Sequence, residues 1–262
     1  MALTDRNKDT KAIVTGGAQG IGLAVAKQLV AEGCKSIALV GRTAEKGRDA
    51  VLELNKLGAD AIFITADVSD VKACADVVTT ALGKFGSVNA LVNAAATSAR
   101  GSLTETTPET FDLIFNTNVK GPFFLMQGVV RHLVETKKPG SIVNVLSMSG
   151  HGGQPFLAPY SASKGALAIL TKNSANAYRK KRIRVNAVMP GWMDTPNEAV
   201  VQAKFHGAGP DWLKKAEAAQ PMGQLAKTHE LAGLITYMLS PESGIMTGSL
   251  VDYDQNIVGT GE

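Results

Sequence analysis

Residues 12–22 have the sequence AIVTGGAQGIG, in which a short apolar run is followed by a cluster of glycines. The apolar run predicts a buried strand, and apolar residues at helical spacing then continue from Ile21 to Glu32, where Gly33 ends the segment. A strand, a glycine loop and a helix in this order predict a phosphate-binding site. Backbone N–H groups at a helix N-terminus attract anions, and glycine lets a phosphate approach closely.

Alternating strands and helices continue along the chain. We predict strands over residues 36–40, 61–65, 90–93, 141–146, 183–188 and 249–253, and helices over 44–57, 71–82, 108–136, 165–177 and 228–239. This alternation favours an α/β fold with a Rossmann-like, doubly wound, seven-stranded parallel sheet and helices on both faces. No repeat or linker interrupts it, so residues 1–262 are predicted to form one domain.

Two segments depart from regular structure. Gly121 and Pro122 fall inside the helix predicted over residues 108–136 and should kink it. Residues 194–222 lie beyond the sixth strand and combine prolines and glycines with short helical pieces. Such a segment is predicted to be a lid insertion on the substrate side.

Tyr160 and Lys164 are four residues apart at the start of a helical segment, so both should lie on one helix face. A free tyrosine has a pKa of about 10, and lowering it to about 7 requires roughly 4 kcal/mol in favour of the phenolate. One cation about 4 Å away in a partly screened site supplies on the order of 4 kcal/mol. The pair could therefore transfer protons near neutral pH. The alternative is a surface tyrosine beside a solvated lysine.

Three sequence motifs follow one another along nearly the whole chain. They are TGxxxGxG over residues 15–22, Ser147 at the end of the fifth strand, and YxxxK over residues 160–164. In this respect the chain resembles the short-chain dehydrogenase/reductase family. The resemblance implies an NAD(P)-dependent oxidoreductase that interconverts a secondary alcohol and a ketone without a metal.

The resemblance also implies the roles of four catalytic residues. Tyr160 would exchange a proton with the substrate oxygen, and Ser147 would stabilise charge there. Lys164 would lower the pKa of Tyr160 and bind the nicotinamide ribose, while Asn118 would complete a proton relay. An oxidised nicotinamide would add a second positive charge near Tyr160.

Cofactor contacts are expected by the same resemblance. The residues concerned are Gly16, Gln19, Gly20, Ile21, Gly22, Arg42, Thr43, Asp67, Val68, Asn93, Ala95, Tyr160, Lys164, Pro190, Met193 and Thr195. Ala94 and Ala96 depart from the Asn-Ala-Gly pattern that is usual after the fourth strand. The methyl group of Ala96 makes the backbone position beside the nicotinamide ribose less certain.

Residues near the second strand bear on the choice of cofactor. Arg42 follows this strand, where an acidic residue would hold a ribose 2′-hydroxyl and an arginine accommodates a 2′-phosphate. This favours NADP over NAD. Gln19 points the other way, because NADP-preferring relatives often have a basic residue there, and use of both cofactors stays open.

The substrate is a small-molecule alcohol or ketone under this interpretation. His151, Gln154 and Trp192 are candidate substrate contacts, and with Asp194 they favour a small sugar or polyol. One alternative is a 3-oxoacyl-[carrier protein] reductase, for which Arg100 and Arg131 could meet an acidic carrier. An alternative of another class is a non-catalytic nucleotide-binding regulator, which the retained catalytic residues disfavour.

Composition excludes several other functions. The net charge of +4 is small for 262 residues, and the basic cluster at residues 179–182 fits a helix C-terminus better than a nucleic-acid site. The four histidines and the cysteines Cys34 and Cys74 show no metal-ligand or disulfide spacing. We therefore expect neither a nucleic-acid partner nor a metal.

Targeting and assembly are also inferred. The first ten residues are polar and charged, and no apolar run is long enough to span a bilayer, so we expect a cytoplasmic protein without a membrane partner. The family resemblance implies a homotetramer.

Overall fold

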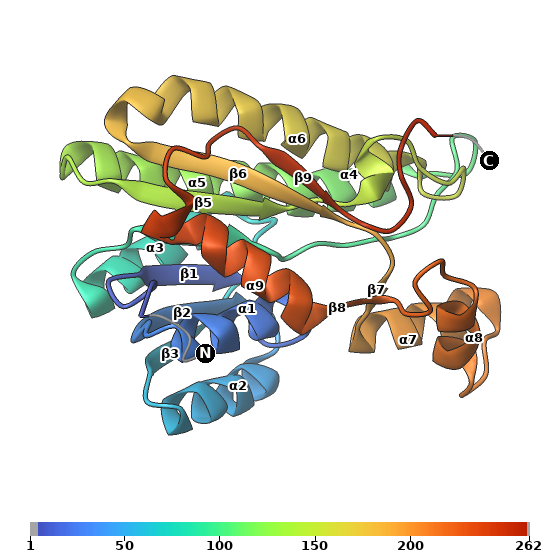
Figure 1. Ribbon diagram of the computed structural model, residues 1–262. Coiled ribbons are helices and arrows are strands. Elements are labelled where there is room, and N and C mark those ends of the chain that lie inside the picture. Colours follow the sequence, from blue (N-terminus) through green and yellow to red (C-terminus); the bar gives the residue numbers. More distant parts are fainter. Residues whose placement is uncertain (1–4, 261–262) are drawn as a thin grey trace.

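The computed structural model describes residues 5–260, and its centre is a seven-stranded parallel sheet of order β3–β2–β1–β4–β5–β6–β9 (Figure 1). The strands are β1 (Lys11–Thr15), β2 (Ser36–Gly41), β3 (Asp60–Thr65), β4 (Ala90–Asn93), β5 (Gly140–Val145), β6 (Ile183–Pro190) and β9 (Leu250–Tyr253). The predicted fold class and strand number are therefore confirmed. The order reverses between β1 and β4, which is where ligands bind in open sheets of this kind.

Helices cover both faces of the sheet. They are α1 (Gly20–Ala31), α2 (Ala44–Lys56), α3 (Val71–Phe85), α4 (Pro108–Phe115), α5 (Gly121–Glu135), α6 (Ala158–Tyr178) and α9 (Thr228–Leu239). The apolar residues of α1, α2 and α9 join one buried cluster, and those of α3, α5 and the end of α6 join another. The two clusters lie on opposite sides of the sheet.

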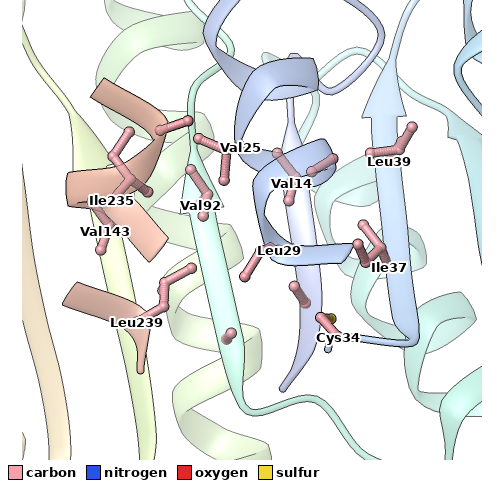
Figure 2. Packing of buried hydrophobic residues seen from close by; sticks show 14 of the residues in the cluster. Val14, Val25, Leu29, Cys34, Ile37, Leu39, Val92, Val143, Ile235 and Leu239 are labelled. Atoms are coloured by element: carbon pink, nitrogen blue, oxygen red, sulfur yellow. The ribbon is translucent and has the colours of Figure 1, made fainter. Parts of the chain in front are cut away.

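The alternation of side chains along the strands produces these two cores. In β1, Ala12 and Val14 belong to the cluster beneath α1, whereas Ile13 belongs to the cluster beneath α3 and α5. Figure 2 shows the first cluster, in which Leu29 of α1 and Ile235 of α9 pack onto the strands. Because both faces are buried, the strands consist of nearly continuous apolar residues, as parallel strands usually do.

Each core also contains one free cysteine. Cys34 is fully buried in the cluster beneath α1 and α9, and Cys74 is almost fully buried between α3 and α5. Loss of water around the thiols raises the pKa of Cys34 to about 12 and that of Cys74 to about 11. Both side chains are therefore protonated, unreactive core residues in the folded protein.

The helical stretch predicted over residues 108–136, which Gly121 and Pro122 were expected to kink or loosen, is loosened just before Gly121. The structure has α4, then a π-helix over Asn116–Lys120, and then α5. Pro122 has no N–H group to bond one turn back, and the N–H of Gly121 bonds the carbonyl of Asn116 five residues earlier. Gly121 also packs so tightly that a Cβ atom there would lie 2.4 Å from the carbonyl oxygen of Val68. The result is a bulge that carries Asn118.

Residues 194–222 fold as two short helices beyond the carboxyl ends of the strands. These are α7 (Pro196–His206) and α8 (Trp212–Ala218), which Figure 1 shows set apart from the layers around the sheet. A two-stranded sheet of β7 (Met193–Asp194) and β8 (Ala226–Lys227) connects them to the main body. Within residues 5–260, no helix is both long and apolar enough to cross a membrane.

Candidate active site

The glycine loop lies at the carboxyl end of β1, beside the point where the strand order reverses. Gly16 and Gly20 have φ angles of 65° and 54°, which glycine adopts without steric cost. Gln19 precedes α1 in an extended conformation, and its side chain does not cap the helix, which leaves N–H groups for a ligand. A Cβ atom on Gly22 would lie 2.4 Å from the carbonyl oxygen of Gly16, so the loop closes tightly on the helix.

Thr15 connects this loop to the loop that follows β4. Its hydroxyl accepts hydrogen bonds from the backbone N–H groups of Ala94 and Ala95, each at 3.0 Å. The backbone at Ala96 is not left-handed. Among the described non-glycine residues, positive φ angles occur at Lys137 and Arg182 and not at Ala96. The methyl group of Ala96 is therefore accommodated without strain.

Charged side chains meet at the end of β2, where an adenosine ribose would lie. The Arg42 guanidinium is exposed, and its Nη1 is 4.0 Å from Oδ2 of Asp67. Lys46, on the first turn of α2, donates a hydrogen bond of 2.9 Å to Oε1 of Gln19. Lys46 was not singled out in the sequence, and this bond places a basic group beside position 19.

Two expected cofactor contacts do not offer side chains to a ligand. Asn93 is buried and donates through Nδ2 to Oδ1 of Asn144 at 2.8 Å, and Val68 is buried beneath α5. Any contact from these two residues would come from the backbone. The remaining predicted loop and helix residues fit a dinucleotide, since the uncapped helix end matches a pyrophosphate and the loop provides close backbone approach.

A cleft of about 1010 Å³ opens at the carboxyl ends of β4, β5 and β6. Ser147, Tyr160 and Lys164 line it, as do the expected cofactor residues Ile21, Pro190, Met193 and Thr195. The cleft thus brings together Tyr160 and Lys164, which were predicted to lie on one helix face, and Ser147 from the segment after β5. Asn118 is buried next to it rather than in its wall.

Ser147 and Tyr160 line the cleft together, and the Ser147 side chain acts to lower the pKa of Tyr160. The backbone N–H of Ser149 donates to the Ser147 oxygen at 3.2 Å and fixes its position at the end of β5. Lys164 is 2% exposed, and its ammonium donates to the carbonyl oxygen of Val145 at 2.8 Å. It lies 5.6 Å from the centre of the Tyr160 ring.

The pKa of Tyr160 was expected to be lowered, but the residues of the chain alone do not lower it. Loss of water raises the pKa of Tyr160, and the carboxylate of Glu198 adds to the rise, while the Ser147 hydrogen bond opposes it. Burial also lowers the pKa of Lys164 to about 8. The spacing of Tyr160 and Lys164 indicates the charge of the lysine, but it does not show how far both groups are desolvated. Tyr160 is therefore a protonated phenol near neutral pH.

Asn118 holds the loop after β4 through its amide. Its Oδ1 accepts from the N–H of Thr97 at 2.9 Å, and its Nδ2 donates to the Thr97 carbonyl and to the Ser163 hydroxyl, each at 3.0 Å. Both amide hydrogen atoms are thus in use. An amide oxygen can accept a second hydrogen bond, so Oδ1 retains one site for a water molecule.

The three candidate substrate residues all line the cleft. Nε2 of His151 lies 2.8 Å from Oδ1 of Asp252, and Nε1 of Trp192 donates to Glu198 at 2.9 Å. Asp194 does not line the cleft, because its carboxylate forms an ion pair of 2.9 Å with Lys227.

Other residues of the cleft wall were not singled out in the sequence. Glu198, Val201, Gln202 and His206 lie on α7, within the segment 194–222 that was predicted as a substrate-side lid, and Asp254, Asn256, Ile257 and Val258 lie in the chain after β9. No local motif distinguishes these residues, since only the folded chain brings residues 198–206 and 254–258 to the same opening. No group of three or more His, Cys, Asp or Glu residues that could hold a metal occurs among residues 5–260.

Comparison with known proteins gives one consistent family. The family described as short chain dehydrogenase matches residues 10–205. An NADP-dependent (R)-specific alcohol dehydrogenase of Lentilactobacillus kefiri is 34% identical, over 94% of this chain and 96% of its own.

Solved structures agree with this assignment. A variant of actinorhodin polyketide ketoreductase, solved with NADPH, is 30% identical with a TM-score of 0.87, covering 94% of this chain and 96% of that one. An NAD⁺-bound xylitol dehydrogenase is 27% identical with a TM-score of 0.85, covering 96% of this chain and 98% of that one.

Proposed function

The chain belongs to the short-chain dehydrogenase/reductase family and is an NAD(P)-dependent oxidoreductase acting on CH–OH groups, and on this premise we propose that Tyr160, Ser147, Lys164 and Asn118 are its catalytic residues. The observation that carries the proposal is that Ser147, Tyr160 and the buried Lys164 line one cleft, which also reaches Ile21 of the glycine-loop helix.

The proton chemistry follows from the state of these groups. In ketone reduction the Tyr160 phenol, which is protonated at neutral pH, donates its proton to the carbonyl oxygen. The Ser147 hydroxyl donates a hydrogen bond to the same oxygen and stabilises the charge that develops there. Bound NAD(P)H supplies the hydride to the carbonyl carbon, and NAD(P)⁺ accepts it in the reverse direction.

Alcohol oxidation requires Tyr160 as the proton acceptor. The Lys164 ammonium lies 5.6 Å from the centre of the Tyr160 ring, and its positive charge favours the phenolate. Because the pKa of Lys164 is about 8, the lysine carries this charge near neutral pH. We propose that a water molecule at the second acceptor site of Asn118 Oδ1 carries this proton away from Tyr160 in oxidation and returns a proton to Tyr160 in reduction.

We propose a small sugar or polyol as the substrate. The cleft wall is rich in amide and imidazole groups, which match hydroxyl groups, and a xylitol dehydrogenase is among the similar structures. The side chains concerned are His151, Gln154, Asn197, Gln202, Gln220 and Asn256. Trp192 would form an apolar side of the pocket, and α7 with the rest of residues 194–222 would act as the lid.

The alternative is reduction of a 3-oxoacyl thioester on a carrier protein. The similarity to a polyketide ketoreductase favours this candidate, and Arg100 lines the cleft, whereas Arg131 lies on the exposed side of α5. Turnover of xylitol, sorbitol and acetoacetyl thioesters, each with NADP and NAD, distinguishes the two. Polyol oxidation supports the proposal, and thioester reduction without polyol oxidation contradicts it.

For the cofactor, we propose a preference for NADP over NAD. Arg42 and Lys46 together provide two exposed cations beside the ribose position, and the 2′-phosphate of NADP carries the matching charge. The similar proteins include enzymes of both kinds, one NADP-dependent and one NAD⁺-bound.

Replacing Arg42 by alanine tests this preference. A hydrogen bond to a charged group is worth roughly 1.5–3 kcal/mol, so the KM for NADP should rise about ten- to a hundredfold while the KM for NAD changes little. Lys46→Ala should act in the same direction. Arg48→Ala removes an exposed charge from the same helix and is the control. Equal changes for NADP and NAD in Arg42→Ala would reject the role.

A homotetramer is expected in solution. Large apolar side chains are exposed on α4, α5 and α6, and these helices can pair with copies of themselves through a symmetric interface. They are Phe111, Leu113, Phe123 and Ile169. Light scattering at micromolar concentration should give the mass of four 27.4 kDa chains. A monomer at that concentration would contradict the expectation.

A further inference from the structure

Arg100 lies in the loop after β4 and lines the same cleft as Ser147 and Tyr160, yet the proposed proton transfer does not use it. Its guanidinium is 4.6 Å from the ring centre of Phe156 and 4.9 Å from that of Phe205, and it donates through Nη2 to Nε2 of His206 at 2.9 Å. We refer to Arg100, Phe156, Phe205 and His206 as the arginine clamp. The clamp joins two loops of the main body to α7.

The clamp is fixed relative to the proposed proton donor. The N–H of Gly101 donates to the carbonyl of Phe156 at 2.9 Å, and the N–H of Ala158 donates to the carbonyl of Gly101 at 3.1 Å. Ala158 is the first residue of α6, two residues before Tyr160. The aromatic rings restrict the guanidinium further, because cations stack on aromatic faces. The side chain of Arg100 is therefore restricted, and its neighbour Gly101 is joined by backbone hydrogen bonds to the start of the helix that carries Tyr160.

The charge of Arg100 is not neutralised by the described part of the chain. No carboxylate of residues 5–260 forms an ion pair with it, and its one hydrogen-bond partner there is the neutral acceptor nitrogen of His206. An arginine has five N–H donors, and most of these have no protein acceptor. The other cation in the cleft wall, Lys164, is bonded to the Val145 carbonyl.

The acidic residues of the cleft contrast with Arg100. Glu198 already accepts hydrogen bonds from Trp192 at 2.9 Å and from Gln202 at 2.7 Å. Its field also acts on Tyr160, so an anionic group of a substrate is repelled from the Glu198 side. Asp254, which also lines the cleft, accepts hydrogen bonds from Gln255 and Asn256, so Arg100 is the group of the wall that would attract an anionic part of a substrate.

We propose that the substrate carries a carboxylate, which Arg100 binds while the reacting carbon lies at Ser147 and Tyr160. A planar guanidinium pairs with a carboxylate through two parallel hydrogen bonds, which gives both affinity and orientation. The proposal rests on the proposed alcohol–ketone function and refines it. Within the proposed sugar or polyol class, the preferred substrate becomes a hydroxy acid such as a sugar acid, or the corresponding keto acid.

Two pairs of probes test the proposal, each differing mainly in charge. The oxidation of gluconate is compared with that of sorbitol, and the reduction of levulinate with that of its methyl ester. For each probe, kcat/KM is measured with the wild type, Arg100→Met, Arg100→Lys and Arg131→Met. The wild type should prefer the acid of each pair. In Arg100→Met the kcat/KM for the acid should fall about ten- to a hundredfold, mainly through KM, with little change for the neutral partner. Arg100→Lys should retain part of the preference, and Arg131→Met all of it.

The outcomes separate this inference from the proposed function. Turnover of the neutral partners without any preference for the acids overturns the carboxylate site and leaves the polyol function intact. An equal loss for acid and neutral partners in Arg100→Met means that the clamp only supports α7, which also overturns it. If no probe turns over, calorimetric titration of gluconate and sorbitol into the complex with NADPH decides. Gluconate binding that Arg100→Met abolishes supports the site, and absence of gluconate binding overturns it.

Discussion

Replacing Tyr160 by phenylalanine is expected to abolish turnover while the affinity for the cofactor stays nearly unchanged. The substitution removes one hydroxyl group, which is the proposed proton donor and belongs to a residue that lines the cleft with Ser147. Loss of a general acid typically costs about 10²–10⁴-fold in rate. Steady-state turnover in both directions measures the loss, and quenching of protein fluorescence by NADPH measures the affinity.

Tyr178→Phe is the matched control for this experiment. Tyr178 is the last residue of the same helix, α6, and packs against the core between α3 and α5, away from the cleft. The control should keep normal turnover. Tyr160→Phe with activity near that of the wild type would reject the catalytic assignment.

Lys164→Met should produce an enzyme that is less active and more stable. Activity falls because the charge that favours the Tyr160 phenolate is lost, so the pH profile of alcohol oxidation should shift to higher pH. Partial recovery of the rate at high pH supports this electrostatic role. A flat loss at every pH, with cofactor binding gone, would mean that Lys164 serves only to hold the cofactor.

The gain in stability follows from burial. Burial lowers the pKa of Lys164 from 10.5 to about 8, so between these values the unfolded chain binds a proton that the native protein does not. Stability therefore rises with pH across this window, and below pH 8 the full penalty for the buried charge is present. The shift corresponds to about 3 kcal/mol, which is the largest gain expected at pH 7 when methionine replaces the ammonium.

Thermal unfolding without added cofactor measures this gain, with Lys172→Met as the control. Lys172 is exposed on α6, so its replacement removes the same charge without a burial effect and should leave the stability nearly unchanged. A Lys164→Met protein that unfolds more easily than the wild type would contradict the argument.

The sequence predicted those features that depend on neighbouring residues. The apolar strands, the glycine loop and the spacing of Tyr160 and Lys164 are local, and the sheet and the cleft contain them as expected. The π-helix before Gly121 was not predicted as such, because the tight contact with Val68 that accompanies it joins distant segments.

Features that depend on burial or on distant contacts could not be predicted. The pKa of Tyr160 was expected to fall, and it rises because the protein removes water from the phenol. Lys46 bonds Gln19 across 27 residues, and Arg100 bonds His206 across 106 residues. No pattern in the sequence indicates such pairs, since each residue alone is typical of an exposed surface.

The buried thiols of Cys34 and Cys74 can report how readily the native structure opens around each of them. A protonated core thiol reacts with a disulfide reagent only when the structure around it opens, so its labelling rate reports the free energy of that opening. Cys34 lies under α1 and α9, and Cys74 lies between α3 and α5, on opposite faces of the sheet. Labelling the native protein therefore distinguishes an opening of one helical layer from cooperative unfolding of both, without introducing any probe.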